Sequence, residues 1–273
     1  MDKLGKTIFK ISMAIFVIIL TIFAFLSVVC VKNTLNILKN DAGYVVVLDA
    51  GHGAPDGGVV GTNTGVLESD LNLKMVKILQ NYLENAGVKV VLTRKNKYAL
   101  SGGAKGFKKE DFKLRKDIIE SENPDAVISI HMNFYKAQPS RRGAQVFYDA
   151  KNPYSLPFAA TLMQKINTEI NKKYGGREYA ALSGDFYIIN STSAPAAIVE
   201  CGFLSNAEDE KLLVGDEYKN EFCYHLFSGV MQYLYTGKIR ASDVCLVTKR
   251  CAFGVIFCCR KSMFLSLRED KVF

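Results

Sequence analysis

The stretch Tyr44–Gly53, YVVVLDAGHG, decides the fold of this chain. Its first part, Tyr44–Asp49, is short, apolar and rich in β-branched residues, a composition that predicts a buried strand. The glycines that flank His52 allow a sharp turn directly after that strand. The stretch therefore predicts a buried strand that delivers a histidine at its carboxyl end.

Two later segments end in the same way. Ala126–Ile130, AVISI, runs directly into His131, and Ala196–Glu200, AAIVE, ends in a carboxylate. Open α/β sheets bind their ligands beyond the carboxyl ends of the strands. We therefore expect His131 and Glu200 to share one site with His52.

Helical and extended segments alternate around these three strands. Such alternation predicts a single α/β domain in which helices cover both faces of a mainly parallel sheet. A polar stretch rich in glycine and lysine, Lys95–Lys109, predicts a flexible loop near the site. The further strands that we expect are Val88–Thr93, Gly143–Tyr148 and Phe186–Ile189. The first expected helix is capped by Ser69 or Asp70 and closes at Gly87. The other expected helices are Glu110–Glu122, Pro157–Tyr174 and Asp216–Tyr235.

The segment Ile11–Val31 is apolar and uncharged, and three lysines precede it. A helix of this length crosses the roughly 30 Å of a bilayer's hydrocarbon core, and the lysines predict that residues 1–10 stay in the cytoplasm. We therefore expect a transmembrane signal-anchor, followed by a linker over residues 32–43. A cleaved signal peptide and a buried core helix are the alternatives, and the former lacks a good small-x-small cleavage site.

Composition bears on two further classes of protein. Because 49% of the 273 residues are hydrophobic, the chain can form a substantial core, and disorder is not expected. The net charge of +8 arises from residues 1–40 and 238–273, so the part between them shows no excess of basic residues and we expect no nucleic acid partner.

Only Cys201 and Cys223 of the seven cysteines lie between residues 41 and 237, which leaves one disulfide as an open alternative. We expect residues 238–273 to be an atypical tail of unknown role.

His52 and His131 share the expected site with Glu68, which lies in GVLES at the start of the first predicted helix. A catalytic zinc ion takes three ligands from histidine and carboxylate side chains and keeps a fourth position for water. A lone histidine is more often structural, as we expect for His225, but the other two of the three histidines end buried strands. We therefore expect His52, Glu68 and His131 to bind one Zn²⁺ per chain. Nothing in the sequence indicates redox chemistry, which favours zinc over iron.

Glu200 ends an apolar run that should be buried. An ionised carboxylate in such a place is costly unless a cation pairs with it. One interpretation is therefore an ion pair with Arg94 or Arg115. The interpretation that we favour is a general base, which takes a proton from water beside zinc and passes it to a leaving amine. It predicts hydrolysis of an amide bond.

Five motifs follow one another between residues 44 and 234: VVLDAGHG, GVLE, LTR, ISIHMN and IVECGFLSN. In this order they resemble the zinc-dependent N-acetylmuramoyl-L-alanine amidases, which cleave bacterial peptidoglycan. The resemblance implies a three-layer α/β/α catalytic domain, over residues 44–237, that cuts the bond between the lactyl group of N-acetylmuramic acid and L-alanine of the stem peptide. It also implies that the three ligands named above hold zinc and that Glu200 is the acid-base group.

The segment RGAQVFYDA, residues 142–150, is similar to the branch of the family that acts on spore cortex. In that branch, removal of the stem peptide precedes formation of muramic-δ-lactam, by which germination enzymes recognise cortex. The resemblance implies an extracytoplasmic enzyme of a Gram-positive spore former, held on the membrane by its N-terminal helix. No long insertion between His131 and Glu200 could form an autoinhibitory helix, so we expect control by a regulatory partner protein.

Three further residues are candidates to contact substrate or to support the ligands: Arg94, Asn133 and Arg115. Because Asn133 is neutral, it offers no carboxylate as a fourth ligand, and the water position should stay open. Cys201 has no histidine to activate it, so we expect it to pack as a small apolar residue.

Three other functions stay open. A zinc peptidase that acts on the stem peptide would use the same ligands and base, because such a site serves any amide. A wall-binding protein of the same fold would need no catalysis, although the presence of all three ligands and Glu200 argues against it. A membrane protein of another function would rest on the apolar N-terminal segment alone.

Overall fold

The computed structural model describes residues 13, 15–22, 43–102 and 107–251, with the backbone alone described for residues 237–251. The chain divides into two compact units, residues 1–233 and 234–273. The sheet and the candidate site belong to the first unit.

Most of the expected membrane segment, Ile11–Val31, lies outside the described residues, as do residues 1–10, most of the linker 32–43 and residues 252–273 of the tail. Within the described ranges, no helix combines the length and the apolar character that are needed to cross a membrane.

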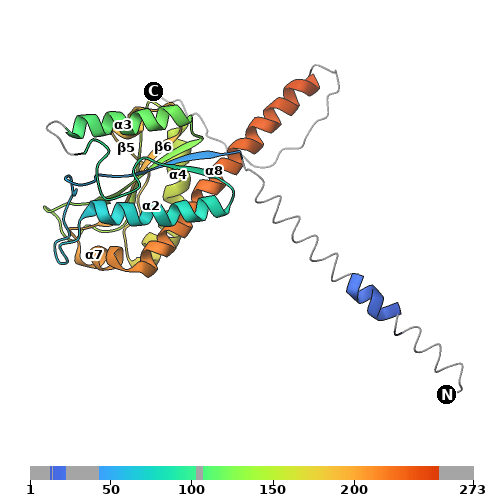
Figure 1. Ribbon diagram of the computed structural model, residues 1–273, viewed down its shortest axis with the longest axis horizontal. Coiled ribbons are helices and arrows are strands. Elements are labelled where there is room, and N and C mark those ends of the chain that lie inside the picture. The colour runs from blue at the N-terminus through green and yellow to red at the C-terminus, as the bar shows by residue number, and fades with distance from the viewer. Residues whose placement is uncertain (1–12, 14, 23–42, 103–106, 252–273) are drawn as a thin grey trace, which may run out of the picture. The chain divides into compact units, whose positions relative to one another are not determined.

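A mixed sheet forms the centre of the first unit (Figure 1). Four neighbouring strands, β2, β1, β3 and β6, run parallel, whereas β4 pairs antiparallel with β6 and β5 runs parallel to β4. The α/β class and the mainly parallel sheet expected from the sequence are confirmed. In the described ranges the strands are β1 (Val45–Ala50), β2 (Lys89–Leu92), β3 (Ala126–Asn133), β4 (Gln145–Tyr148), β5 (Leu182–Ser183) and β6 (Ala196–Phe203), in the spatial order β2-β1-β3-β6-β4-β5.

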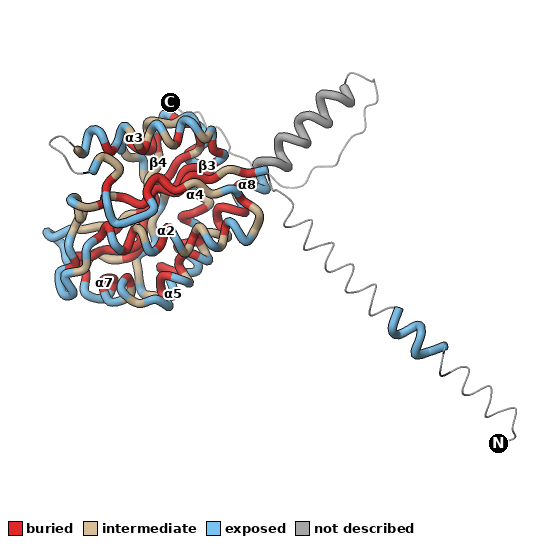
Figure 2. The backbone as a smooth tube through the Cα atoms, viewed as in Figure 1, coloured by how far each residue is buried: buried red, intermediate tan, exposed pale blue. Residues whose placement is uncertain are grey.

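Helices pack on both faces of this sheet, with α3 on one side and α2 on the other (Figure 1). On the first face, Val47, Val127 and Ile198 of three adjacent strands form one apolar cluster with Ile119 of α3 and Ile188 of α6. The central strands β1, β3 and β6 are buried along most of their length, as Figure 2 shows. The helices are α2 (Glu68–Asn85), α3 (Phe107–Glu122), α4 (Ser155–Lys165), a π-helical continuation η1 (Ile166–Asn171), α5 (Lys172–Tyr174), α6 (Tyr187–Asn190), α7 (Ala207–Val214) and α8 (Asp216–Cys251).

The expected strand Phe186–Ile189 is wrong, because this segment forms the short helix α6. The segment is apolar because its side chains pack against other apolar side chains. The Phe186 ring packs edge-on against the Phe147 ring with centroids 5.4 Å apart, and Ile188 and Ile189 are buried in the core. A short apolar run does not distinguish a buried strand from a helical turn.

The start of α2 also differs from expectation. The helix begins at Glu68, and its N-cap Leu67 makes no side-chain hydrogen bond, so the expected cap by Ser69 or Asp70 is wrong. Backbone carbonyls of the preceding loop accept from the first amides instead: Glu68 N–H donates to Val59 at 2.9 Å and Ser69 N–H to Gly57 at 3.0 Å. This arrangement leaves the Glu68 side chain free to enter the site.

Two other helices differ from the expectation. Helix α3 begins at Phe107, which shortens the loop expected over Lys95–Lys109. Helix α7 was not expected, although Asn206 caps it by accepting from the backbone amides of Glu208 and Asp209.

Candidate metal centre and active site

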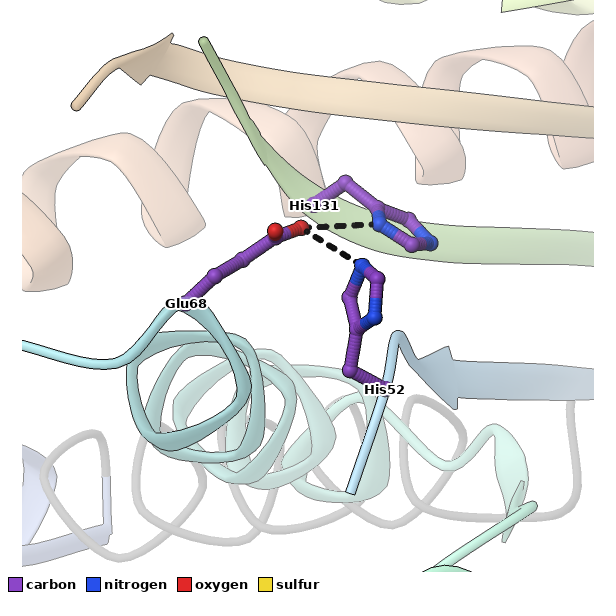
Figure 3. Close-up of side chains that lie close together, drawn as sticks. All are labelled: His52, Glu68 and His131. Carbon is purple, nitrogen blue, oxygen red and sulfur yellow. Dashed lines mark hydrogen bonds and ion pairs between the residues drawn. The ribbon is translucent and has the colours of Figure 1, made fainter. Parts of the chain in front are cut away.

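Three side chains from distant parts of the sequence meet at the carboxyl ends of β1 and β3 (Figure 3). Oε1 of Glu68 lies 3.3 Å from Nε2 of His52 and 3.0 Å from Nδ1 of His131. One donor atom from each residue lies within 4.8 Å of the other two. The structure therefore brings together the residues expected to bind a metal, at separations that suit one shared cation.

The backbone around these residues is shaped to bring them close. His52 adopts a left-handed conformation with φ +61°, which is uncommon for a residue other than glycine. A Cβ atom on Gly51 would overlap the His131 ring, and one on Gly58 would overlap Glu68 and His52. Both glycines are therefore needed for the chain to pass directly beside the three donors.

Glu68 is held in its ionised form. Its Oε2 accepts from the backbone amide of Val59 at 2.9 Å, and its Oε1 accepts from that of Met132 at 3.2 Å. Burial raises the pKa of Glu68, but hydrogen bonds and charge from His131 and His52 outweigh burial and hold that pKa well below its usual range. The carboxylate is therefore charged and held in place at neutral pH, as a metal ligand needs to be.

His52 is oriented from its other side by Asp56. Nδ1 of His52 lies 3.0 Å from Oδ2 of Asp56, and Lys108 of α3 lies 3.1 Å from the same oxygen. Burial lowers the pKa of His52, but hydrogen bonds and charge from Glu68 and Asp56 exceed that effect and raise it. A carboxylate behind a metal-binding histidine fixes the tautomer and makes the free nitrogen a better ligand, which leaves Nε2 for a metal.

A buried ion network lies beneath the His52 turn. Arg115 of α3 donates to Oδ1 of Asp49 at 2.6 Å, to Asp111 at 2.7 Å and to the backbone carbonyls of Ala50 and His52. Burial raises the pKa of Asp49, but Arg115, with hydrogen bonds from Ser129 and Thr93, lowers it to about 2. The network ties α3 to the end of β1 and supports the strained residue His52 through its carbonyl.

Arg94 supports the same turn from a second direction. Its guanidinium donates to the backbone carbonyls of Ala50, Gly51, Ser69 and Asn96 at 2.8 to 2.9 Å. Arg94 and Arg115 are each only 2% exposed. Both expected supporting arginines therefore lie behind the ligands, and neither pairs with Glu200 among the described residues.

Glu200 lies beside His131 on the neighbouring strand. The two residues are in register in the parallel β3–β6 pair, so their side chains project from the same face of the sheet. Its Oε2 is buried and has no hydrogen-bond partner in the described part of the chain. Burial is the main reason why the pKa of Glu200 rises to about 7; the charge of Glu68 also raises this pKa, whereas the charges of His131 and His52 lower it. The expected alternative, an ion pair with Arg94 or Arg115, is not formed.

A pocket of about 150 Å³ opens beside the two histidines. Its walls carry charge from Asp56 and Lys108 and aromatic rings from Phe107 and Phe112. The site thus combines a His/Glu/His donor set, a carboxylate of near-neutral pKa and a recess that can hold part of a substrate. This combination is typical of metal-assisted hydrolysis.

Comparison with known proteins identifies the family. Residues 46–232, most of the chain, match the N-acetylmuramoyl-L-alanine amidases. The chain belongs to this family. The amidase is 31% identical over 198 residues to the germination-specific N-acetylmuramoyl-L-alanine amidase of Bacillus subtilis, a match that covers 70% of this chain and 80% of that protein.

Solved structures agree with this assignment. The CwlD amidase from Clostridioides difficile, solved in complex with the GerS lipoprotein, is 28% identical with a TM-score of 0.66, over 71% of this chain and 99% of that one. The amidase AmiC2 of Nostoc punctiforme is 28% identical with a TM-score of 0.62, over 72% of this chain and 99% of that one. The mixed α/β fold of the amidase is therefore that of its family.

Several residues of the amidase site were not expected from the sequence. Asp56, Asp49 and Glu210 support the ligands or their loop, and Glu210 of α7 accepts from both backbone and side chain of Asn63 and Thr64. The sequence could have indicated Asp56 as a partner of His52, because it follows His52 by four residues on a glycine-rich loop. No local signal marks Glu210, since its partners lie far away in the sequence.

The structure also shows the surroundings of four other residues that the sequence analysis named. Asn133 donates through Nδ2 to Oε1 of Gln145 at 2.9 Å, at the edge of the site. His225 lies on α8 near Glu221, 3.9 Å away, and is not among the three clustered donors. Cys201 and Cys223 are buried and free, so no disulfide joins them.

Proposed function

We propose that this chain is a zinc-dependent amidase that hydrolyses the bond between N-acetylmuramic acid and L-alanine in spore cortex peptidoglycan. The observation that carries the proposal is the meeting of His52, Glu68 and His131 within 4.8 Å, with Glu200 in register beside them. Two imidazoles and a carboxylate are a donor set of catalytic zinc sites, which keep one position open.

The donors fit such an ion in charge as well as in geometry. Glu68 stays ionised, and each histidine can present a neutral nitrogen once its proton is displaced by a metal. A bound Zn²⁺ supplies Lewis acidity, which polarises the scissile carbonyl and acidifies a water molecule. Asn133 offers no carboxylate, which keeps the donor number at three.

Glu200 provides the acid-base function in this proposal. Its carboxylate accepts a proton from the attacking water and then donates it to the nitrogen of the leaving L-alanine. A pKa raised to about 7 suits both steps, because the group can take up and release a proton at neutral pH. Burial without an ion-pair partner supports this role, since a purely structural carboxylate in that position would be expected to have one.

Spore cortex is the proposed substrate because of the likeness to the germination-specific amidase of Bacillus subtilis and the segment RGAQVFYDA, residues 142–150. Removal of stem peptides there would precede muramic-δ-lactam formation. The apolar segment Ile11–Val31 supports an extracytoplasmic location with a membrane anchor.

A regulatory partner is part of the proposal. The related CwlD amidase of Clostridioides difficile was solved in complex with a lipoprotein, and we infer that a protein of that kind controls this amidase. Assays should therefore include the wall-associated lipoproteins of the same organism.

The test is digestion of purified cortex peptidoglycan by the protein with zinc, with the products read by mass spectrometry. The proposal predicts free lactyl ends and intact released peptides, and loss of both after chelation. Shortened peptides that remain on muramic acid would instead identify a zinc peptidase. Zinc binding without any product, with candidate partners present, would favour a wall-binding protein.

A further inference from the structure

Two buried polar atoms at the site lack a hydrogen-bond partner among the described residues: Nε2 of Gln145 and Oε2 of Glu200. One is a donor and the other, when Glu200 is ionised, is an acceptor only. Buried polar groups in folded proteins nearly always have a partner, so each such exception calls for an explanation.

The sheet places these two residues side by side. Gln145 of β4 and Glu200 of β6 are directly opposite each other in the antiparallel pair. Residues opposite each other project from the same face, with Cβ atoms about 4.5 to 5.5 Å apart. Gln145 is only 1% exposed, so bulk water does not reach its amide.

Asn133 determines which way the Gln145 amide faces. Oδ1 of Asn133 accepts from the backbone amide of Phe134 at 2.8 Å, so its Nδ2 must be the end that meets Gln145. That Nδ2 donates to Oε1 of Gln145 at 2.9 Å. The oxygen of Gln145 is therefore engaged, and its NH₂ group is the end left to donate.

We propose that Gln145 is a positioning residue, whose Nε2 donates to Oε2 of Glu200 and holds that carboxylate with Oε1 left for proton transfer. This single contact would give both orphan atoms a partner at once. The chain of contacts runs from the Phe134 amide through Asn133 and Gln145 to Glu200. This inference rests on the proposed function, in which Glu200 is the acid-base group.

The first test replaces Gln145 by methionine, which has a similar length and no donor. Gln145→Met should lower kcat by about 10-fold or more, as loss of supporting hydrogen bonds in active sites does, while KM and zinc content stay within about 2-fold. A raised KM with unchanged kcat would show that Gln145 binds substrate, and unchanged kinetics would show that it does nothing; either result overturns the proposal.

A double-mutant cycle separates positioning from a general structural effect. If Gln145 acts through Glu200, Gln145→Met should change the residual kcat of Glu200→Gln by less than about 2-fold, because coupled residues are not additive. An equal loss in both backgrounds would overturn the proposal. Asn152→Ala is the matched control: this buried amide donates to the carbonyls of Ser193 and Ala194, so the substitution should lower Tm and leave kcat unchanged.

A crystal structure of the zinc-loaded protein tests the contact without any assay. Nε2 of Gln145 should lie within hydrogen-bond distance of Oε2 of Glu200, about 2.7 to 3.2 Å. A separation beyond roughly 4 Å would overturn the proposal. Wild-type protein that shows the contact but has no amidase activity, even with the candidate partner proteins present, would instead refute the proposed function.

Discussion

The two sides of the site treat their carboxylates in opposite ways. On the side of the β1 turn and α2, Glu68 accepts hydrogen bonds from two backbone amides and faces two histidines, and its pKa is held well below the usual range. On the strand side, Glu200 has an orphan oxygen and a pKa raised to about 7. Environments that separate the pKa values of two neighbouring carboxylates also separate their roles. In the proposed mechanism, the turn side therefore provides a metal ligand and the strand side provides the base.

Removal of a ligand should have the largest effect. His131→Ala takes away one of three donors, so we expect the metal to be released and amidase activity to be lost. Metal analysis of the purified protein measures this directly. His225→Ala, on α8 and outside the cluster, should keep one zinc per chain. Unchanged zinc content in the first variant would assign the ligand to another residue.

Breaking the support beneath the turn should come next. Arg115→Met leaves Asp49 and Asp111 without their buried cation, and removal of one partner of a buried ion pair destabilises a protein by about 3 to 5 kcal/mol. Urea unfolding measures the loss. Lys173→Met is the control, since the Lys173 side chain is exposed where it pairs with Glu221, and exposed pairs contribute roughly 1 kcal/mol or less. Similar losses in both variants would remove the special role of Arg115.

The pH dependence of stability should carry opposite signs for the two carboxylates in zinc-free protein. Glu200 has an ordinary pKa of 4.5 and a folded pKa of about 7. The unfolded chain therefore loses this proton first, and the destabilisation grows from about pH 4.5 and is complete above about pH 7. At roughly 1.4 kcal/mol per pKa unit, it reaches on the order of 3 kcal/mol. Glu200→Gln should thus raise Tm at pH 8 and change it little at pH 4.

Glu68 should do the reverse. Its depressed pKa stabilises the folded state above its unfolded value of 4.5, and that stabilisation is lost as the pH falls. Glu68→Gln should therefore lower Tm at pH 8, and it should lower Tm by less as the solution is made more acidic. Shifts of the same sign for both variants at pH 8 would break the comparison.

The smallest of these effects should follow from Asp56→Asn. The side-chain amide of asparagine is a weaker acceptor for Nδ1–H of His52 than the Asp56 carboxylate. Loss of such a partner typically weakens metal binding by about 10- to 100-fold. Competition with a zinc chelator gives the affinity. Asp117→Asn, which alters an exposed pair with Lys113, should leave it unchanged. Equal affinities in all three proteins would mean that Asp56 does not orient His52.

The sequence predicted those residues of the candidate site that a local sequence pattern marks. His52, His131 and Glu200 each follow an apolar run, and Glu68 begins a helix, so strand-end placement was enough to group them. Gln145 and Glu210 have no such pattern, because their roles depend on partners brought near by the sheet and by α7. The error at Phe186–Ile189 has the same origin: four apolar residues fit a strand or a helical turn, and packing against Phe147 and the core decides between them.

The most direct test of the account is the Glu200→Gln variant, with zinc content and the rate of cortex peptidoglycan digestion measured on the same sample. If Glu200 is the base and not a ligand, the variant should keep one zinc per chain and lose at least about 100-fold in rate, in line with general acid-base contributions. Near-normal turnover, or loss of the zinc, would contradict the assignment of the two carboxylates to different roles.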